Sequence, residues 1–141
     1  MSLVALLGGP RMLGAKPKSA REWHAVIARG VPVRSAEVLK NALQVSDSVL
    51  AQLLGVSEKT LSRARGAGAS LNTVASDRLF RVARVTALAR DVFESSDASV
   101  SWLRRPQPGL GGQVPVDLLT TSAGTEEVER LLLRIEYGVY S

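Results

Sequence analysis

Few side chains in this sequence could carry out acid–base or metal chemistry. The chain has one histidine, His24, and no cysteine, so thiolate zinc sites, cysteine nucleophiles and multi-histidine metal sites are excluded. A serine or threonine nucleophile needs a neighbouring base, and His24 is the one conventional candidate. It stands beside Trp23 in a stretch of helical spacing, where a surface or packing role is expected. We predict no catalytic residue, no metal site and no cofactor.

Two other groups look like sites but have simpler explanations. Glu126, Glu127 and Glu129 crowd an expected helix start, where carboxylates interact favourably with the positive end of the helix dipole. Residues 109–112 read Gly-Leu-Gly-Gly, but no strand precedes them and no Lys-Ser/Thr pair follows, so they do not form a phosphate-binding loop. A tight turn is expected there, and we predict that the chain is not an enzyme.

The sequence does support nucleic-acid recognition, and the pattern that indicates it lies in residues 47–66. Ala51 is small where two helices would cross, and Gly55 stands where the first helix must turn through a left-handed backbone. Ser57 is a suitable N-cap for the second helix, and Leu61 and Ala64 would face the first. This pattern predicts a helix-turn-helix; an ordinary helix pair with a glycine turn is the alternative.

The outer face of the second helix would then enter a major groove of DNA. Arginine and lysine read guanine edges, and serine hydrogen-bonds bases or phosphates. Glu58 would repel phosphate, so binding by this helix alone could be weak. The predicted DNA-binding residues are Ser57, Glu58, Lys59, Ser62, Arg63 and Arg65.

The charge distribution agrees with DNA binding by the N-terminal part and a different function for the C-terminal part. Residues 1–90 hold 14 Lys/Arg and 5 Asp/Glu, whereas residues 91–141 hold 4 arginines and 8 Asp/Glu. A basic segment favours a polyanion partner, and an acidic one would be repelled by DNA. Two solvated surfaces of opposite sign would give the same counts. No apolar run approaches the length of a membrane span, and the short apolar stretch at residues 3–7 is not a signal peptide, so a cytoplasmic protein is expected.

The elements that must position these residues are all helical. Glycine and proline make residues 1–18 a predicted flexible arm, and a long helix is expected over residues 74–93, with Arg78, Arg81 and Arg84 along one side. We predict an all-α fold with a helix-turn-helix domain of the Cro/lambda-repressor type at 19–84, joined through the long helix to a small helical domain at 85–141. The residues expected to begin helices are Ser19, Ser35, Ser57, Asp97 and Thr125.

The last third of the chain resembles a known family. Trp-Leu at 102–103, Pro-x-x-x-Leu-Gly-Gly at 106–112, Pro-x-Asp-Leu-Leu at 115–119 and Tyr-Gly-Val at 137–139 occur in the order typical of the Xre/MbcA/ParS antitoxins. The chain is most similar to the Xre partners of RES-domain toxins, over roughly residues 35–141. The resemblance implies that the C-terminal domain binds and inhibits a RES toxin that consumes NAD⁺. It also implies that the helix-turn-helix domain binds the promoter of its own operon.

Two further expectations concern assembly and the chain end. Helix-turn-helix proteins are commonly two-fold dimers, and a C-terminal part of about 50 residues is short for a core of its own, so a homodimer is predicted. Exposed tyrosines are typical of interface hot spots, and a terminal carboxylate suits an arginine-lined site. The tail is therefore a candidate plug of the toxin's NAD⁺ cleft, or else it packs back on the last helix. The predicted toxin-binding residues are Tyr137, Gly138, Val139, Tyr140 and Ser141.

A different function class stays open. The chain could be a plain helix-turn-helix repressor whose C-terminal domain only dimerises or senses a small molecule. The tail and the motifs from Trp102 to Gly112 favour the antitoxin.

Overall fold

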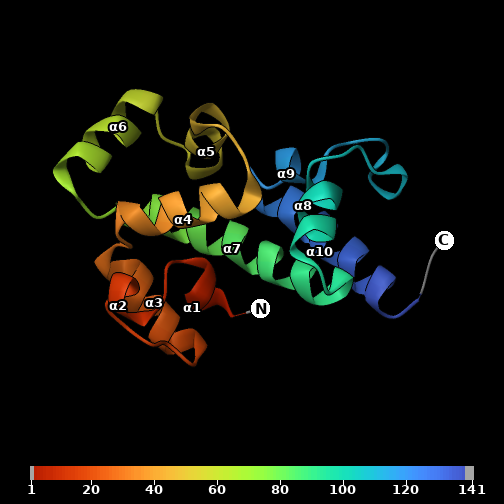
Figure 1. The fold of residues 1–141 in the computed structure, drawn as a ribbon, viewed down its shortest axis with the longest axis horizontal. Helices are drawn as coiled ribbons and strands as arrows, with labels where there is room; N and C mark the ends of the chain where they lie inside the picture. Colours follow the sequence, from red (N-terminus) through yellow and green to blue (C-terminus); the bar gives the residue numbers. More distant parts are fainter. Residues whose placement is uncertain (1, 139–141) are drawn as a thin grey trace.

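The structure is a computed structural model that describes residues 2–138. Within that range every regular element is a helix, and strand-like pairing occurs as two isolated bridges, Pro32 with Ser70 and Gln107 with Gln113. The predicted all-α fold is confirmed (Figure 1). In chain order the elements are α1 (Leu3–Leu6), α2 (Pro10–Leu13), α3 (Ala20–Arg29), α4 (Val33–Leu43), α5 (Asp47–Leu54), α6 (Glu58–Ala67), α7 (Thr73–Phe93), α8 (Ser96–Leu103), η1 (Pro108–Leu110), α9 (Pro115–Leu118) and α10 (Ser122–Glu136).

Helix α7 is the centre of the molecule. Its 21 residues make a rod about 30 Å long, and Figure 1 shows it running through the middle with other helices on several sides. Helices α1, α3, α4 and α5 pack on it, and so do α8 and α10. Thr73, Val74, Asp77 and Arg84 on one side of it are exposed. The buried residues occupy the broad opposite side: Ala75, Ser76, Leu79, Val82, Ala83, Val85, Thr86, Ala87 and Ala89.

One apolar core therefore joins the two predicted domains. Buried residues form a single cluster that extends from Leu6 near one end of the chain to Leu132 near the other. The domain boundary expected between residues 84 and 85 lies inside α7. The C-terminal part thus buries its apolar side chains against a helix that also supports the helix-turn-helix.

Some helix starts follow the predicted caps. Ser19 precedes α3, and its hydroxyl accepts a hydrogen bond from the Glu22 N–H at 3.1 Å. The Glu22 carboxylate in turn accepts from the N–H of Lys18 at 3.0 Å, one residue earlier than in the usual reciprocal cap. Gly30 ends α3 with a positive φ of 100°.

Three predicted caps are wrong. Helix α4 begins at Val33 after Pro32, so Ser35 lies within the helix and is buried. Helix α8 is capped by Ser95, whose hydroxyl accepts from the Ala98 N–H at 3.2 Å, and Asp97 falls in its first turn. Helix α10 is capped by Thr121 rather than Thr125. The three glutamates at 126, 127 and 129 consequently lie beyond the first turn of α10.

The N-terminal segment departs from the expected arm. It forms α1 and α2, and its Leu6, Leu7 and Leu13 are almost completely buried. Helix α1 packs on α4 and α7, and α2 packs on α4. Pro10 begins α2 and Gly14 ends it, and the leucines of this segment complete the core.

This packing makes the N-terminal segment part of the stability of the fold. Replacing Leu7 by Ala should lower the free energy of unfolding by about 2–5 kcal/mol, because it leaves a cavity in a site with no solvent exposure. Chemical denaturation followed by circular dichroism measures the change. Arg11→Ala, an exposed position in the same segment, is the matched control. Equal stability of the two variants would contradict the packing described here.

Candidate nucleic-acid and partner interfaces

Helices α5 and α6 form the predicted helix-turn-helix. Gly55 ends α5 in the left-handed region, with φ of 70°, and the next N–H, of Val56, bonds to the Ala51 carbonyl at 3.0 Å. A residue with a side chain would be strained at this φ. Ser57 then caps α6 by accepting from the Thr60 N–H at 3.0 Å. Both predicted turn residues are thus placed as the motif requires.

The two faces of α6 differ in the predicted way. Leu61 is buried and Ala64 is half-buried against the rest of the molecule. Ser57, Glu58, Lys59, Ser62 and Arg63 are exposed. The Ser57 hydroxyl donates to Thr60 Oγ1 at 2.9 Å in addition to its capping bond, so it is engaged within the helix. Thr60 is also exposed on this helix, although the sequence analysis did not include it.

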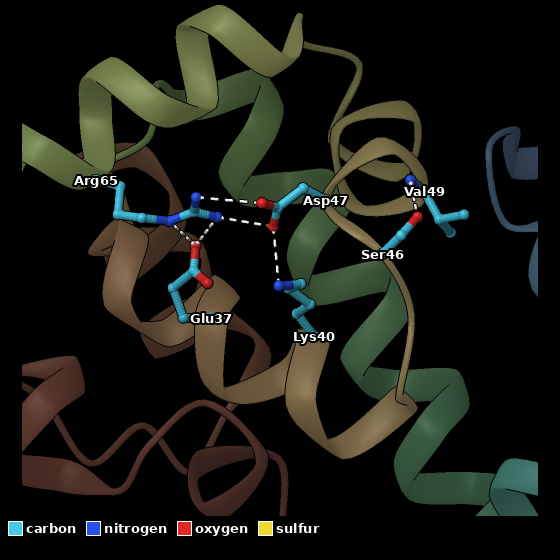
Figure 2. A network of polar contacts seen from close by, with 6 residues as sticks. All are labelled: Glu37, Lys40, Ser46, Asp47, Val49 and Arg65. Atoms are coloured by element: carbon cyan, nitrogen blue, oxygen red, sulfur yellow. Dashed lines mark hydrogen bonds and ion pairs between the residues drawn. The ribbon is translucent and has the colours of Figure 1, made fainter.

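Arg65 is exposed, but carboxylates from two other helices hold its guanidinium (Figure 2). Its Nε donates to Glu37 of α4 at 2.8 Å, and its Nη2 lies 2.9 Å from an oxygen of Asp47 at the start of α5. Lys40 of α4 reaches the same Asp47 oxygen at 2.9 Å. Hydrogen bonds from Arg65 and then Lys40 lower the pKa of Asp47 from its ordinary value. The bond to Asp47, followed by that to Glu37, raises the pKa of Arg65.

This network ties the three helices of the DNA-reading unit together. The contacts of Arg65 span 28 residues to Glu37 and 18 to Asp47, so sequence spacing could not reveal them. The network is partly exposed, and exposed ion pairs contribute modestly to stability. Its geometric effect is to fix α6 against α4 and α5. A DNA contact by Arg65 stays a prediction, and one that competes with these partners.

The arginines along α7 have a similar internal role. Arg81 donates to the Leu119 carbonyl at 3.2 Å and to the Ser122 hydroxyl at 3.1 Å. Arg84 pairs with Glu129 at 2.9 Å. Burial, and next the nearby Arg78, lowers the pKa of Arg81. These arginines anchor the start and the second turn of α10 on α7.

The junction of α9 and α10 is tight. Thr121 caps α10 by accepting from the Gly124 N–H at 2.9 Å. A Cβ at Gly124 would lie 2.1 Å from the Leu118 carbonyl oxygen, so only glycine fits here without a backbone shift. Together with Arg81, this contact sets the direction in which α10 leaves the core.

The far end of α10 presents an apolar surface. Three large apolar side chains are exposed among residues 2–138, and two of them, Leu133 at 41% and Tyr137 at 76%, stand one turn apart on α10. Gly138 follows with φ of 69°. Val139, Tyr140 and Ser141 lie outside the described residues. The sequence offered a signal for Leu133, because three successive leucines at 131–133 cannot all face one side of a helix.

The acid–base candidates lie apart from one another. His24 is exposed on α3, Glu126 pairs with Arg130 one turn away, and Gly111 and Gly112 form a turn closed by the Gln107–Gln113 bridge. Across the described part of the chain, no cluster of His, Cys, Asp and Glu could hold a metal ion. No helix there is long and apolar enough to cross a membrane.

Comparison with known proteins matches both halves of the chain. Residues 22–84 match a model of the antitoxin Xre-like helix-turn-helix domain. Residues 88–138 match a model of the antitoxin Xre/MbcA/ParS C-terminal toxin-binding domain.

Individual relatives extend over most of the chain. A protein of Sphingobium sp. named Prs ADP-ribosylating antitoxin is 30% identical over 82% of this chain and 79% of its own length. The antitoxin Xre of Photorhabdus laumondii is 28% identical over 93% of this chain and 89% of its own. The antitoxin Xre of Pseudomonas putida is 44% identical, over 45% of this chain and 40% of its own. With an Xre-like helix-turn-helix followed by a toxin-binding domain, the chain belongs to the Xre/MbcA/ParS family of antitoxins.

Proposed function

We propose that this antitoxin binds a RES-type toxin and stops it from degrading NAD⁺ by covering its active site. The observation that carries the proposal is the exposed pair Leu133 and Tyr137 at the end of α10, inside the matched toxin-binding segment. Apolar and aromatic side chains of this kind supply most of the binding energy in protein interfaces when a partner buries them. The predicted tail continues directly from this surface. Arg81 and Arg84 hold α10 in place, so the surface is pre-organised.

We also propose that the protein represses its own operon as a homodimer on promoter DNA. The exposed Lys59 and Arg63 stand one turn apart on α6, which suits contacts to base edges and phosphates in a major groove. A two-fold dimer would present two such helices to a palindromic site. The alternative is a plain repressor whose C-terminal domain only dimerises or senses a small molecule, and the match of residues 88–138 to a toxin-binding domain favours the antitoxin.

The name of one relative favours a second candidate for the toxin's chemistry. The Sphingobium protein is named as an antitoxin of Prs ADP-ribosylation, and ADP-ribosyl transfer also consumes NAD⁺. The two candidates differ in product: free ADP-ribose from degradation, or a modified protein from transfer. Incubating the partner toxin with labelled NAD⁺ and cell extract separates them, since only transfer leaves the label on protein.

The tail should be required for inhibition. Deleting Tyr140 and Ser141 should leave the fold intact, because α10 ends at Glu136, and should abolish inhibition of the toxin's NAD⁺ consumption. Thermal unfolding of the truncated chain serves as the control for folding. Full inhibition by the truncated protein would show that the tail does not act as a plug.

Tyr137 should be an energetic centre of the toxin interface. Tyr137→Ala should weaken toxin binding by about 2 kcal/mol, roughly 30-fold in Kd, measured by calorimetry or by titration of NAD⁺ consumption. Val74→Ala is the matched control, since Val74 is an exposed apolar residue, at 62%, in the DNA-binding half. Equal losses in both variants would argue against a specific toxin surface on α10.

DNA binding and toxin inhibition should be separable. Arg63→Ala should weaken binding to the protein's own promoter DNA by about 1–3 kcal/mol, roughly 5- to 150-fold, with toxin inhibition unchanged. Arg11→Ala removes an exposed arginine outside the helix-turn-helix and is the control. Unchanged promoter affinity of the Arg63 variant would remove α6 as the reading helix.

A further inference from the structure

A polar hollow opens where the DNA-binding half meets the toxin-binding half. It has a volume of about 410 Å³ and lies between the end of α4 and helix α8, which Figure 1 shows next to each other. The function proposed above gives it no role. Its lining residues are Gln44, Asp97, Val100, Ser101, Arg104 and Arg105.

Two arginines and one carboxylate, Asp97, line the hollow, so cationic side chains outnumber acidic ones there although this part of the chain is acidic. Residues 91–141 carry twice as many carboxylates as arginines, yet residues 98–116 contain no acidic residue. Arg104 and Arg105 are exposed, and no carboxylate within residues 2–138 pairs with either guanidinium. Arg65 and Arg84 by contrast pair with carboxylates of the protein itself. Two adjacent free guanidiniums suit an anionic partner with several oxygens.

The position of the hollow beside α5 indicates that the anion it binds is the phosphate backbone of DNA. Gln44 on its rim comes two residues before Ser46, the N-cap of α5. In helix-turn-helix complexes the first helix of the motif crosses the DNA backbone while the second enters the groove. DNA bound in this way would bring phosphates past the start of α5, two residues from Gln44 of the hollow.

Gln44 lines the hollow at the end of α4. It has φ of 56°, a left-handed conformation that glycine or asparagine usually occupies. Glu94 ends α7 in the same conformation, with φ of 54°. A glutamine in this state costs stability relative to glycine, and its neutral amide can donate hydrogen bonds.

The geometry points to a second DNA-phosphate site, formed by Arg104 and Arg105 with Gln44 and Ser101, on the toxin-binding domain. This inference rests on the proposed DNA binding and extends it across the domain boundary. Phosphodiester oxygens would accept from the two guanidiniums and from the neutral amide and hydroxyl. Asp97 lies at the opposite end of α8 from the arginines and opposes the same phosphates by charge repulsion.

The salt dependence of DNA affinity tests the site directly, because each lost phosphate contact lowers the slope of log K against log salt by about 0.9. The full chain, R104A/R105A, Asp97→Asn and Gln44→Gly would be titrated with a duplex of its own promoter and an unrelated duplex of equal length. R104A/R105A should reduce the magnitude of the slope by about 1–2. It should weaken binding to both duplexes equally. Asp97→Asn should tighten binding. Gln44→Gly should raise the midpoint of thermal unfolding while it weakens DNA binding, an opposition that a purely structural role would not produce.

Arg134→Ala, an exposed arginine on α10 of the same domain, is the matched control and should leave the slope unchanged. The inference is overturned if R104A/R105A binds DNA with wild-type affinity and slope. Loss of toxin inhibition at unchanged DNA affinity would instead assign the hollow to an acidic segment of the toxin. If the wild-type chain binds neither duplex, the proposed repression fails as well. If R104A/R105A weakens DNA binding but Arg63→Ala does not, the phosphate site in the hollow is supported and the proposal that α6 reads the groove is wrong.

Discussion

The packing of α7 against helices from both halves of the chain is the constraint on which the rest of the structure depends. Its broad buried side contributes apolar surface to each of these neighbours. Neither the helix-turn-helix nor the toxin-binding part has a separate core, so each gains its stability from the same rod. The leucines of α1 and α2 close one side of this arrangement, which is why the N-terminal segment belongs to the fold.

A shared central helix also determines how the two functional surfaces are presented. Helix α5 packs on α4 and α7, helix α6 packs on α4 and α5, and the network around Arg65 fixes their mutual orientation. Helix α10 packs on α7 and is fixed by Arg81, Arg84 and the close contact of Gly124 with Leu118. Both surfaces are thus built on rigid elements, and a rigid surface loses less conformational entropy on binding.

The arginines of this chain divide into two groups with different consequences. Arg65, Arg81 and Arg84 count toward the basic charge of the N-terminal half, but the structure uses them to join helices. Arg63, with Lys59, and the pair Arg104 and Arg105 are exposed and unpaired within the described residues. Net charge along the sequence therefore overestimates the number of arginines available to a partner on the basic half, and it hides two exposed arginines within the acidic half.

The sequence by itself determined the features that depend on contacts within a few residues. Helical periodicity, the left-handed Gly55 and the Ser57 cap were predicted correctly, because the groups that satisfy them are near neighbours along the chain.

The structure alone decided the features that depend on distant partners. Ser35, Asp97 and Thr125 have the local chemistry of caps, but Pro32, Ser95 and Thr121 begin the helices, since packing such as that of Gly124 on Leu118 selects among adjacent candidates. The arm prediction failed for the same reason: Leu7 and Leu13 bury themselves on helices far along the chain. The partners of Arg65, Arg81 and Arg84 lie 18 to 45 residues away, beyond the reach of any local pattern.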